Sequence, residues 1–136
     1  MIRPIMKSTL ILSRPSAPAT AQDAGVAQDL LDTFAANRQE CVGMAANMIG
    51  ILKRIIVVDC EGEALLMHNP VIVSSSNPYE TQEGCLSLDG VRPATRYRTI
   101  TVTYEDKDFS SKKHTFSGYT AQIIQHEIDH CSGVVI

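Results

Sequence analysis

The sequence has no excess of positive charge, no long apolar run and no closely spaced pair of cysteines. Its net charge of −3 gives no basic surface of the kind that binds nucleic acid. No apolar segment approaches the roughly 20 residues of a membrane-spanning helix. The first residues lack the long apolar segment and small-residue cleavage site of a signal peptide. These absences predict a cytoplasmic protein that contacts neither nucleic acid nor membrane directly.

The four cysteines, Cys41, Cys60, Cys85 and Cys131, form no Cys-x-x-Cys pair, which argues against a zinc knuckle or a thioredoxin-type redox site. In a cytosolic chain we expect them to be reduced, with one available as a metal ligand. A hydrophobic content of 44% and a charged content of 20% are ordinary for a soluble globular protein. The length predicts one domain over residues 1–136.

The chain carries a His-Glu-x-x-His motif close to its end, within Gln125–His130. On a helix, residues four apart lie on one face, so His126 and His130 can hold one metal ion together. Glu127 can then reach a water on that metal without displacing the histidines. This pattern is typical of metal-assisted hydrolysis.

A catalytic site of this type needs a third protein ligand. The segment 131–136 contains no His, Asp or Glu, so that ligand lies upstream or is Cys131 itself. The alternative reading of the motif is a pair of histidines on a helix surface. The flanking Ile123, Ile124 and Ile128 favour histidines that point into the protein, where a metal satisfies them.

Two further segments have a composition that suits a site. In Glu83–Ser87, the glycine before Cys85 lets another backbone or a ligand approach closely. From the residues alone, Cys85 is either a small buried hydrophobic side chain or a ligand. The small residues of Gly43–Gly50 indicate close packing, a substrate channel or a tight turn.

The spacing of apolar residues predicts an α+β fold, with a mostly antiparallel sheet packed around the C-terminal metal-binding helix and an N-terminal helix. We expect the first helix at Ala21–Asn37. Thr20 precedes it and forms a capping box with Asp23. We expect the last at Gly118–Cys131, capped by Ser117 and stopped by Gly133. The expected strands are Arg54–Asp59, Ala64–Val73 with an interruption at Asn69-Pro70, Thr99–Tyr104 and Lys113–Phe116. The expected loops are Arg14–Ala19, Ser74–Pro78 and Lys107–Lys113.

Taken together, the three motif segments resemble the peptide deformylase family. That family carries Gly-x-Gly-(Leu/Met)-Ala-Ala-x-Gln, then Glu-Gly-Cys-Leu-Ser, then Gln-His-Glu-x-Asp-His. The second and third motifs are intact here, at Glu83–Ser87 and Gln125–His130. The first motif departs twice, with Cys41 in place of its first glycine and Met48 in place of its glutamine. The resemblance extends over nearly the whole chain and is to a short variant.

The resemblance implies that Cys85 is the third ligand beside His126 and His130, holding one divalent ion. Fe(II) is the expected metal, with Zn, Ni or Co able to occupy the site. Glu127 would take a proton from the bound water as it attacks the formyl carbon, and pass it to the departing amine. The backbone N–H of Leu86 would stabilise the oxyanion. The implied substrate is a nascent polypeptide that begins with formyl-methionine, and formate is released.

The altered first segment bears on rate and on substrate binding. The family's glutamine is expected to donate to the oxyanion, and losing one such donor costs about 10²–10³ in rate. Asn47 could substitute for Met48 only if its amide rotated inward. Beside Met48, the residues expected to line the methionine pocket are Val42, Gly43, Met44 and Tyr119.

Charged side chains near the motifs have expected partners too. Glu83 and Arg92 could form an ion pair that braces the cysteine loop, and Asp129 could orient a metal-bound histidine or an arginine. The chain ends soon after the expected helix, without the C-terminal extension that longer members use in part to contact the ribosome. Ribosome docking is therefore not supported by the sequence.

Two other functions compete with this reading. One is a catalytically weak or silent relative that binds a metal or a peptide, which Met48 favours. The other is a small zinc endopeptidase, which the lack of a His or Glu ligand after His130 disfavours.

Overall fold

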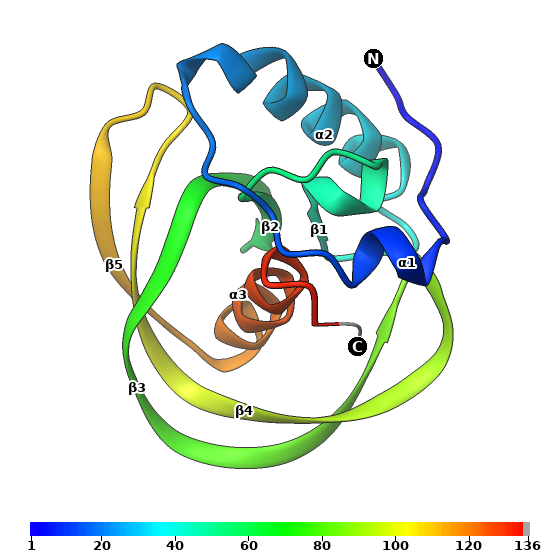
Figure 1. Cartoon of the computed structure of the whole chain (residues 1–136). Coiled ribbons are helices and arrows are strands. Elements are labelled where there is room, and N and C mark those ends of the chain that lie inside the picture. The colour runs from blue at the N-terminus through cyan, green and yellow to red at the C-terminus, as the bar shows by residue number, and fades with distance from the viewer. Residues whose placement is uncertain (135–136) are drawn as a thin grey trace.

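In a computed structural model, which describes residues 1–134 apart from the side chain of Leu88, five antiparallel strands form one sheet. Their spatial order follows the chain: β1 (Gly43–Ala45), β2 (Ile55–Cys60), β3 (Glu63–Cys85), β4 (Leu88–Glu105) and β5 (Ser111–Ser117). The helices are α1 (Thr9–Leu12), α2 (Ala24–Ala36) and α3 (Gly118–Cys131), with short 3-10 helices η1 (Ala21–Asp23) and η2 (Ala46–Ile49). The sheet curls around α3, while β1 and β2 lie between α2 and α3 (Figure 1). The predicted α+β class and antiparallel sheet are confirmed.

The hairpin of β3 and β4 is longer than the sequence predicted. The segment Ser74–Pro78, expected to be a loop, lies within β3 and pairs with β4, so that prediction was wrong. Strand β2 pairs with β3 only as far as His68, so the following residues have a free edge. A free edge tolerates Pro78, which has no N–H to donate. The interruption expected at Asn69-Pro70 appears as a register shift between His68 and Val71. The last residues expected in a loop, 111–113, likewise belong to β5.

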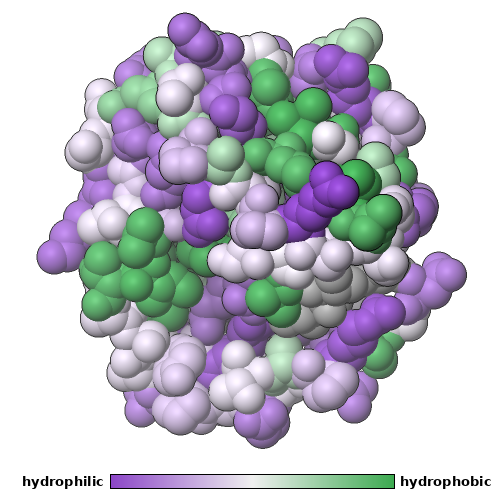
Figure 2. Space-filling view, in the orientation of Figure 1, coloured by the Kyte–Doolittle hydropathy of each residue, from purple (hydrophilic) through white to green (hydrophobic). Residues whose placement is uncertain are grey.

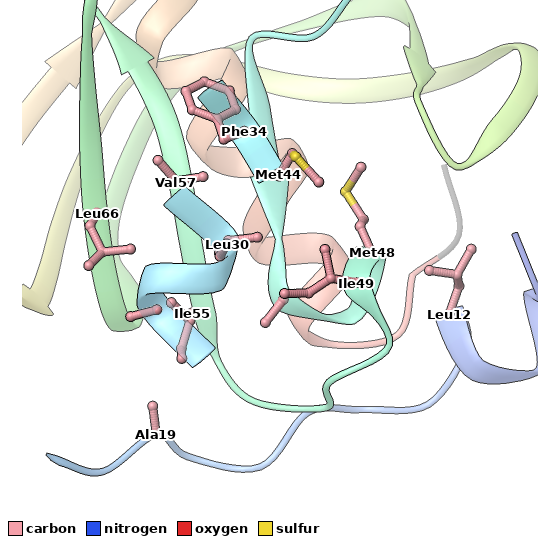
Figure 3. Close-up of a cluster of buried hydrophobic side chains, with 12 residues drawn as sticks. Leu12, Ala19, Leu30, Phe34, Met44, Met48, Ile49, Ile55, Val57 and Leu66 are labelled. Atoms are coloured by element: carbon pink, nitrogen blue, oxygen red, sulfur yellow. The ribbon is translucent and has the colours of Figure 1, made fainter. Parts of the chain in front are cut away.

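The capping box predicted at Thr20 is present, but it caps the 3-10 helix η1, and the α-helix α2 begins at Ala24. The Asp23 carboxylate accepts from the Thr20 N–H at 2.8 Å, and the chain passes through η1 into α2. One face of α2 buries Leu30 and Phe34 against Ile55 in an apolar cluster that also contains Met44 and Met48 (Figure 3). This cluster fixes η2 and β1 against the helix.

Helix α3 packs on the other side of β1 and β2. Its Ile124 is buried with Val58 and Val102 in a second apolar cluster. Ser117 lies at the N-cap position as predicted, but its side chain makes no capping hydrogen bond. The chain instead turns from β5 into the helix at Gly118, whose φ of 64° favours glycine. Gly133 ends the helix as predicted, and a Cβ there would lie 2.5 Å from the Ser13 carbonyl oxygen.

No helix within residues 1–134 combines the length and the apolar character needed to cross a bilayer. On the face drawn in Figure 2, apolar groups are interrupted by hydrophilic side chains. The apolar core of the fold consists of the two buried clusters, which lie on opposite sides of β1 and β2.

Candidate metal centre and active site

Three potential metal ligands, far apart in the sequence, meet at one point. Cys85 ends β3, and His126 and His130 lie one turn apart on α3. Their ligand atoms all lie within 4.8 Å of one another, and we refer to these three side chains as the metal group. Cys131, the alternative ligand considered from the sequence, lies outside this group, and its carbonyl accepts from the Ser16 N–H at 2.8 Å. The motif alone left the third ligand either upstream or at Cys131, the resemblance implied Cys85, and the geometry favours Cys85.

The group fits a divalent cation. The Nε2 atoms of His126 and His130 face each other at 3.0 Å, and both side chains are buried. Burial lowers the pKa of His130 to about 3. For His126, burial also opposes protonation, but hydrogen bonds to Cys85 and Glu83 outweigh it and raise its pKa to about 10. One of the two facing nitrogens must carry a proton to bridge to the other, and a metal bound by both would replace that proton. One thiol and two imidazoles form a donor set that suits Zn(II) or Fe(II).

A buried ion-pair network lies behind His126. The Glu83 carboxylate is 2.8 Å from His126 Nδ1, and Arg96 donates to it through Nη2 at 2.7 Å. Arg96 also donates to Asp129 at 2.6 Å, and Gln122 donates to Glu83 at 2.9 Å. Burial alone would raise the pKa of Glu83, but these hydrogen bonds lower it to about 2. The ionised carboxylate fixes the His126 ring with Nε2 toward the metal group.

The partner predicted for Glu83 was wrong. Arg92 lies opposite Glu83 in the strand register, but its side chain donates to the Asp89 carbonyl. Arg96 takes its place because α3 crosses over that position and supplies a second carboxylate from Asp129. The expectation that Asp129 orients an arginine is confirmed. Arg92 and Arg96 are four residues apart on one strand, so both lie on the same face of the sheet. The sequence therefore does not indicate which of them pairs with Glu83.

Glu127 lies beside the metal group, 3% exposed, and its Oε1 has no hydrogen-bond partner among the described residues. Burial raises its pKa to about 7. A carboxyl group with that pKa can both accept and return a proton near neutral pH. Gly43 makes this packing possible, since a Cβ there would lie 3.0 Å from Glu127 Oε2 and 2.7 Å from the Ile123 side chain.

A cavity of about 660 Å³ opens beside Glu127. Four of the residues predicted to line a substrate pocket do line it: Val42, Gly43, Met48 and Tyr119. The lining also includes Cys85, Leu86, His126 and Glu127. Lining residues that the sequence reasoning missed include Arg38, Glu40, Gln122 and Ile123. Of these, Ile123 could have been found, because it lies four residues before Glu127 on the same helix face.

The prediction that Met44 lines the pocket was wrong. Successive residues of a strand point to opposite faces, so Gly43 faces α3 and the cavity while Met44 faces away. Met44 is completely buried and packs with Leu30 and Phe34 in the cluster under α2 (Figure 3).

Met48 and Cys41, the two residues at which the first segment departs from the family pattern, both line the cavity. Met48 borders the cavity and uses its sulfur to accept from the Ala45 N–H at 3.4 Å, so it offers no donor to a ligand. Asn47 does not meet the condition for replacing the family's glutamine, because its amide donates to the His130 carbonyl at 2.9 Å. Cys41 also lines the cavity, and burial raises its pKa to about 11. The Leu86 peptide lies at the cavity wall, and its carbonyl accepts from Lys7 at 2.7 Å.

Comparison with known proteins agrees with this geometry. The family model described as polypeptide deformylase matches residues 3–136. A peptide deformylase of Clostridium beijerinckii is 53% identical over 136 residues, covering 100% of both chains. A Synechocystis peptide deformylase is 41% identical over 118 residues, covering 81% of this chain and 62% of its own.

Solved structures give the same result. A class I type b peptide deformylase from Acinetobacter baumannii, with Met-Ala-Ser bound, superposes with a TM-score of 0.88 at 29% identity, covering 99% of this chain and 97% of that one. The peptide deformylase from Thermotoga maritima gives a TM-score of 0.89 at 26% identity, covering 99% and 95%. With the family model spanning almost the whole sequence, this chain belongs to the peptide deformylase family.

Proposed function

We propose that the peptide deformylase activity of this chain resides at Cys85, His126, His130 and Glu127, and that its substrate is a formyl-methionyl peptide. The observation that carries the proposal is the convergence of one sulfur and two ring nitrogens within 4.8 Å, beside a buried carboxyl group. The relative solved with Met-Ala-Ser bound supports a peptide that begins with methionine as the product. Residues 1–136 would act as one catalytic domain in the cytoplasm.

In this proposal the metal is held by Cys85, His126 and His130. When bound, it supplies a Lewis acid that lowers the pKa of a water molecule and polarises the formyl carbonyl. Fe(II) is the proposed ion, and Zn, Ni or Co would be accepted by the same donors. Glu127 accepts the proton of the attacking water and then gives it to the departing amine, for which its pKa of about 7 is suited.

The remaining residues bind and orient the peptide. The Leu86 N–H would donate to the oxygen that develops negative charge, and Lys7 holds the next carbonyl of that loop in place. Val42, Met48 and Tyr119 give the cavity apolar walls for the methionine side chain. Met48 occupies the position of the family's glutamine and donates nothing, so the oxyanion has fewer partners here.

That substitution favours a second candidate function, a relative that binds metal and peptide with little or no turnover. A small zinc endopeptidase is the third, and the family assignment argues against it.

Turnover of formyl-Met-Ala-Ser separates these candidates. Protein prepared without oxygen and loaded with iron should release formate, whereas Glu127→Ala should retain the iron and release none. Oxygen must be excluded because a thiolate beside ferrous iron is open to oxidation. Formate release no greater than that of the variant would support the silent relative, and cleavage inside a longer unformylated peptide would support the endopeptidase.

A further inference from the structure

The two histidines of the metal group differ at their outer ring nitrogens. His126 Nδ1 lies 2.8 Å from Glu83, whereas His130 Nδ1 is buried and has no partner in the described part of the chain. A histidine that binds a metal through Nε2 carries its proton on Nδ1, and that N–H is normally donated to an acceptor. Metal binding would therefore leave His130 with a buried donor that requires an acceptor.

Asn47 is the residue that can supply this acceptor. It lies on η2, its side chain is completely buried, and its Nδ2 donates to the His130 carbonyl at 2.9 Å. Its Oδ1 is also buried and makes no hydrogen bond to any described residue. Three other buried oxygens without partners belong to Ser16, Ser87 and Glu127, but none of these side chains is bonded to His130, and Glu127 is assigned to the attacking water. Asn47 thus combines an existing contact with the ligand and an unused acceptor.

We infer that Asn47 is a positioning residue for the metal ligand His130. Its Nδ2 holds the backbone carbonyl of His130, and its Oδ1 accepts the Nδ1–H once a metal is bound. The inference rests on the proposed metal site and adds a contribution of the first segment to it. In this chain η2 supplies no oxyanion donor from Met48, and instead orients the second histidine through the residue before it.

Zinc affinity of matched variants tests the inference. Asn47→Leu removes both hydrogen-bonding atoms, and loss of a partner behind a metal ligand weakens metal binding by about 10–100-fold. Asn69→Leu is the control, because the Asn69 side chain also bonds to backbone, at Ala19, but lies away from the metal group. Both variants should unfold at a lower temperature as apoproteins, and only Asn47→Leu should bind zinc more weakly. Asn47→Asp keeps an acceptor and loses the donor, so it should recover at least tenfold of the lost affinity.

Equal zinc affinity of Asn47→Leu and wild type would overturn the inference while leaving the proposed function intact. An Asn47→Asp affinity as low as that of Asn47→Leu would also overturn it, because only the bond to the carbonyl would then matter. A wild-type protein that binds no zinc at Cys85, His126 and His130 would overturn the proposed function as well.

Nuclear magnetic resonance of the zinc-loaded wild type gives a test that needs no variant. Labelled histidine should show ring N–H protons that exchange slowly with water on the Nδ1 atoms of His126 and His130, besides that of the buried His68, whose Nδ1 donates to the Asp106 carbonyl. The His130 proton should show a nuclear Overhauser effect to Asn47. Rapid exchange of the His130 proton, or protonation at Nε2, would overturn the inference even if every Asn47 variant failed to fold.

Discussion

The two walls of the active site are built differently. The wall formed by the cysteine loop and α3 contains a buried ion-pair network, in which Glu83 is bonded to His126 and Arg96, and Arg96 is bonded to Asp129. The opposite wall, the segment 41–48, is mainly apolar. There Met48 belongs to the cluster under α2 and accepts a hydrogen bond where a glutamine could have donated one.

This difference separates the role of Met48, which bears on transition-state stabilisation, from metal binding, to which the same segment contributes through Asn47. The ion-pair network fixes one ligand histidine, and it is complete without any group from segment 41–48. The oxyanion, in contrast, would receive donors from both walls in the usual family pattern. A chain with this arrangement should therefore bind its metal normally and pay for Met48 in turnover rate alone. The predictions below change one wall at a time.

Removal of the Glu127 carboxyl group should have the largest effect. We expect Glu127→Ala to lower kcat by about 10²–10⁴-fold, the range of a general base. Among the described residues, the other carboxyl groups that line the cavity are the ion-paired Glu83 and Glu40. Iron content should stay at the wild-type level, as measured by atomic absorption. Activity within threefold of wild type would assign the proton transfer to another group.

Breaking the ion-pair network should come second. Arg96→Met leaves the buried Glu83 with His126 and Gln122 but without the guanidinium, and loss of one partner from a buried pair costs about 3–5 kcal/mol in the free energy of unfolding. Arg92→Met is the control, since that side chain bonds only to an exposed carbonyl, and it should change stability by less than about 0.5 kcal/mol. Urea denaturation of both variants measures the difference. Similar losses would mean that Glu83 is held by other groups.

Filling the space at Gly43 should come third. In Gly43→Ala the new Cβ would meet the Ile123 side chain at 2.7 Å and Glu127 at 3.0 Å. We expect a loss of about 1–3 kcal/mol in stability from overpacking, together with a lower kcat because Glu127 is displaced. Gly25→Ala, where a Cβ meets nothing within 4 Å on α2, is the matched control and should not lower stability. An unchanged melting temperature and an unchanged rate of formate release for Gly43→Ala would contradict this prediction. That result would mean that segment 41–48 can move away from α3 to make room for the Cβ.

Restoring the amide at position 48 should have the smallest effect. We expect Met48→Gln to raise kcat by about tenfold, less than the 10²–10³ that loss of an oxyanion donor costs, because the side chain lies in an apolar cluster. Zinc affinity should not change, since Met48 is not one of the three side chains whose ligand atoms converge. An unchanged kcat would indicate that another donor already reaches the oxyanion.

The sequence predicted those parts of the molecule that depend on local periodicity. The helical spacing of His126 and His130, the capping box at Thr20 and the β-branched run that forms β2 each gave a correct element. The parts that depend on packing against a distant segment were missed. No local signal shows that Ser74–Pro78 extends β3, because the partner strand β4 decides it.

The same limit applies within the site. Whether Met44 or its neighbours face the cavity depends on which side of β1 lies against α3, and sequence alternation does not give that choice. Arg96 replaces Arg92 as the partner of Glu83 because Asp129 approaches from α3. The amide of Asn47 reaches a residue 83 positions away, a contact that no short motif encodes.

The central claim is that Cys85, His126 and His130 hold one metal ion beside Glu127. Anomalous X-ray scattering, recorded on crystals of the zinc-loaded protein on both sides of the zinc absorption edge, tests it most directly. The account predicts a single strong peak between the Cys85 sulfur and the Nε2 atoms of the two histidines. A peak elsewhere, or well-ordered side chains at this site with no peak, would contradict it.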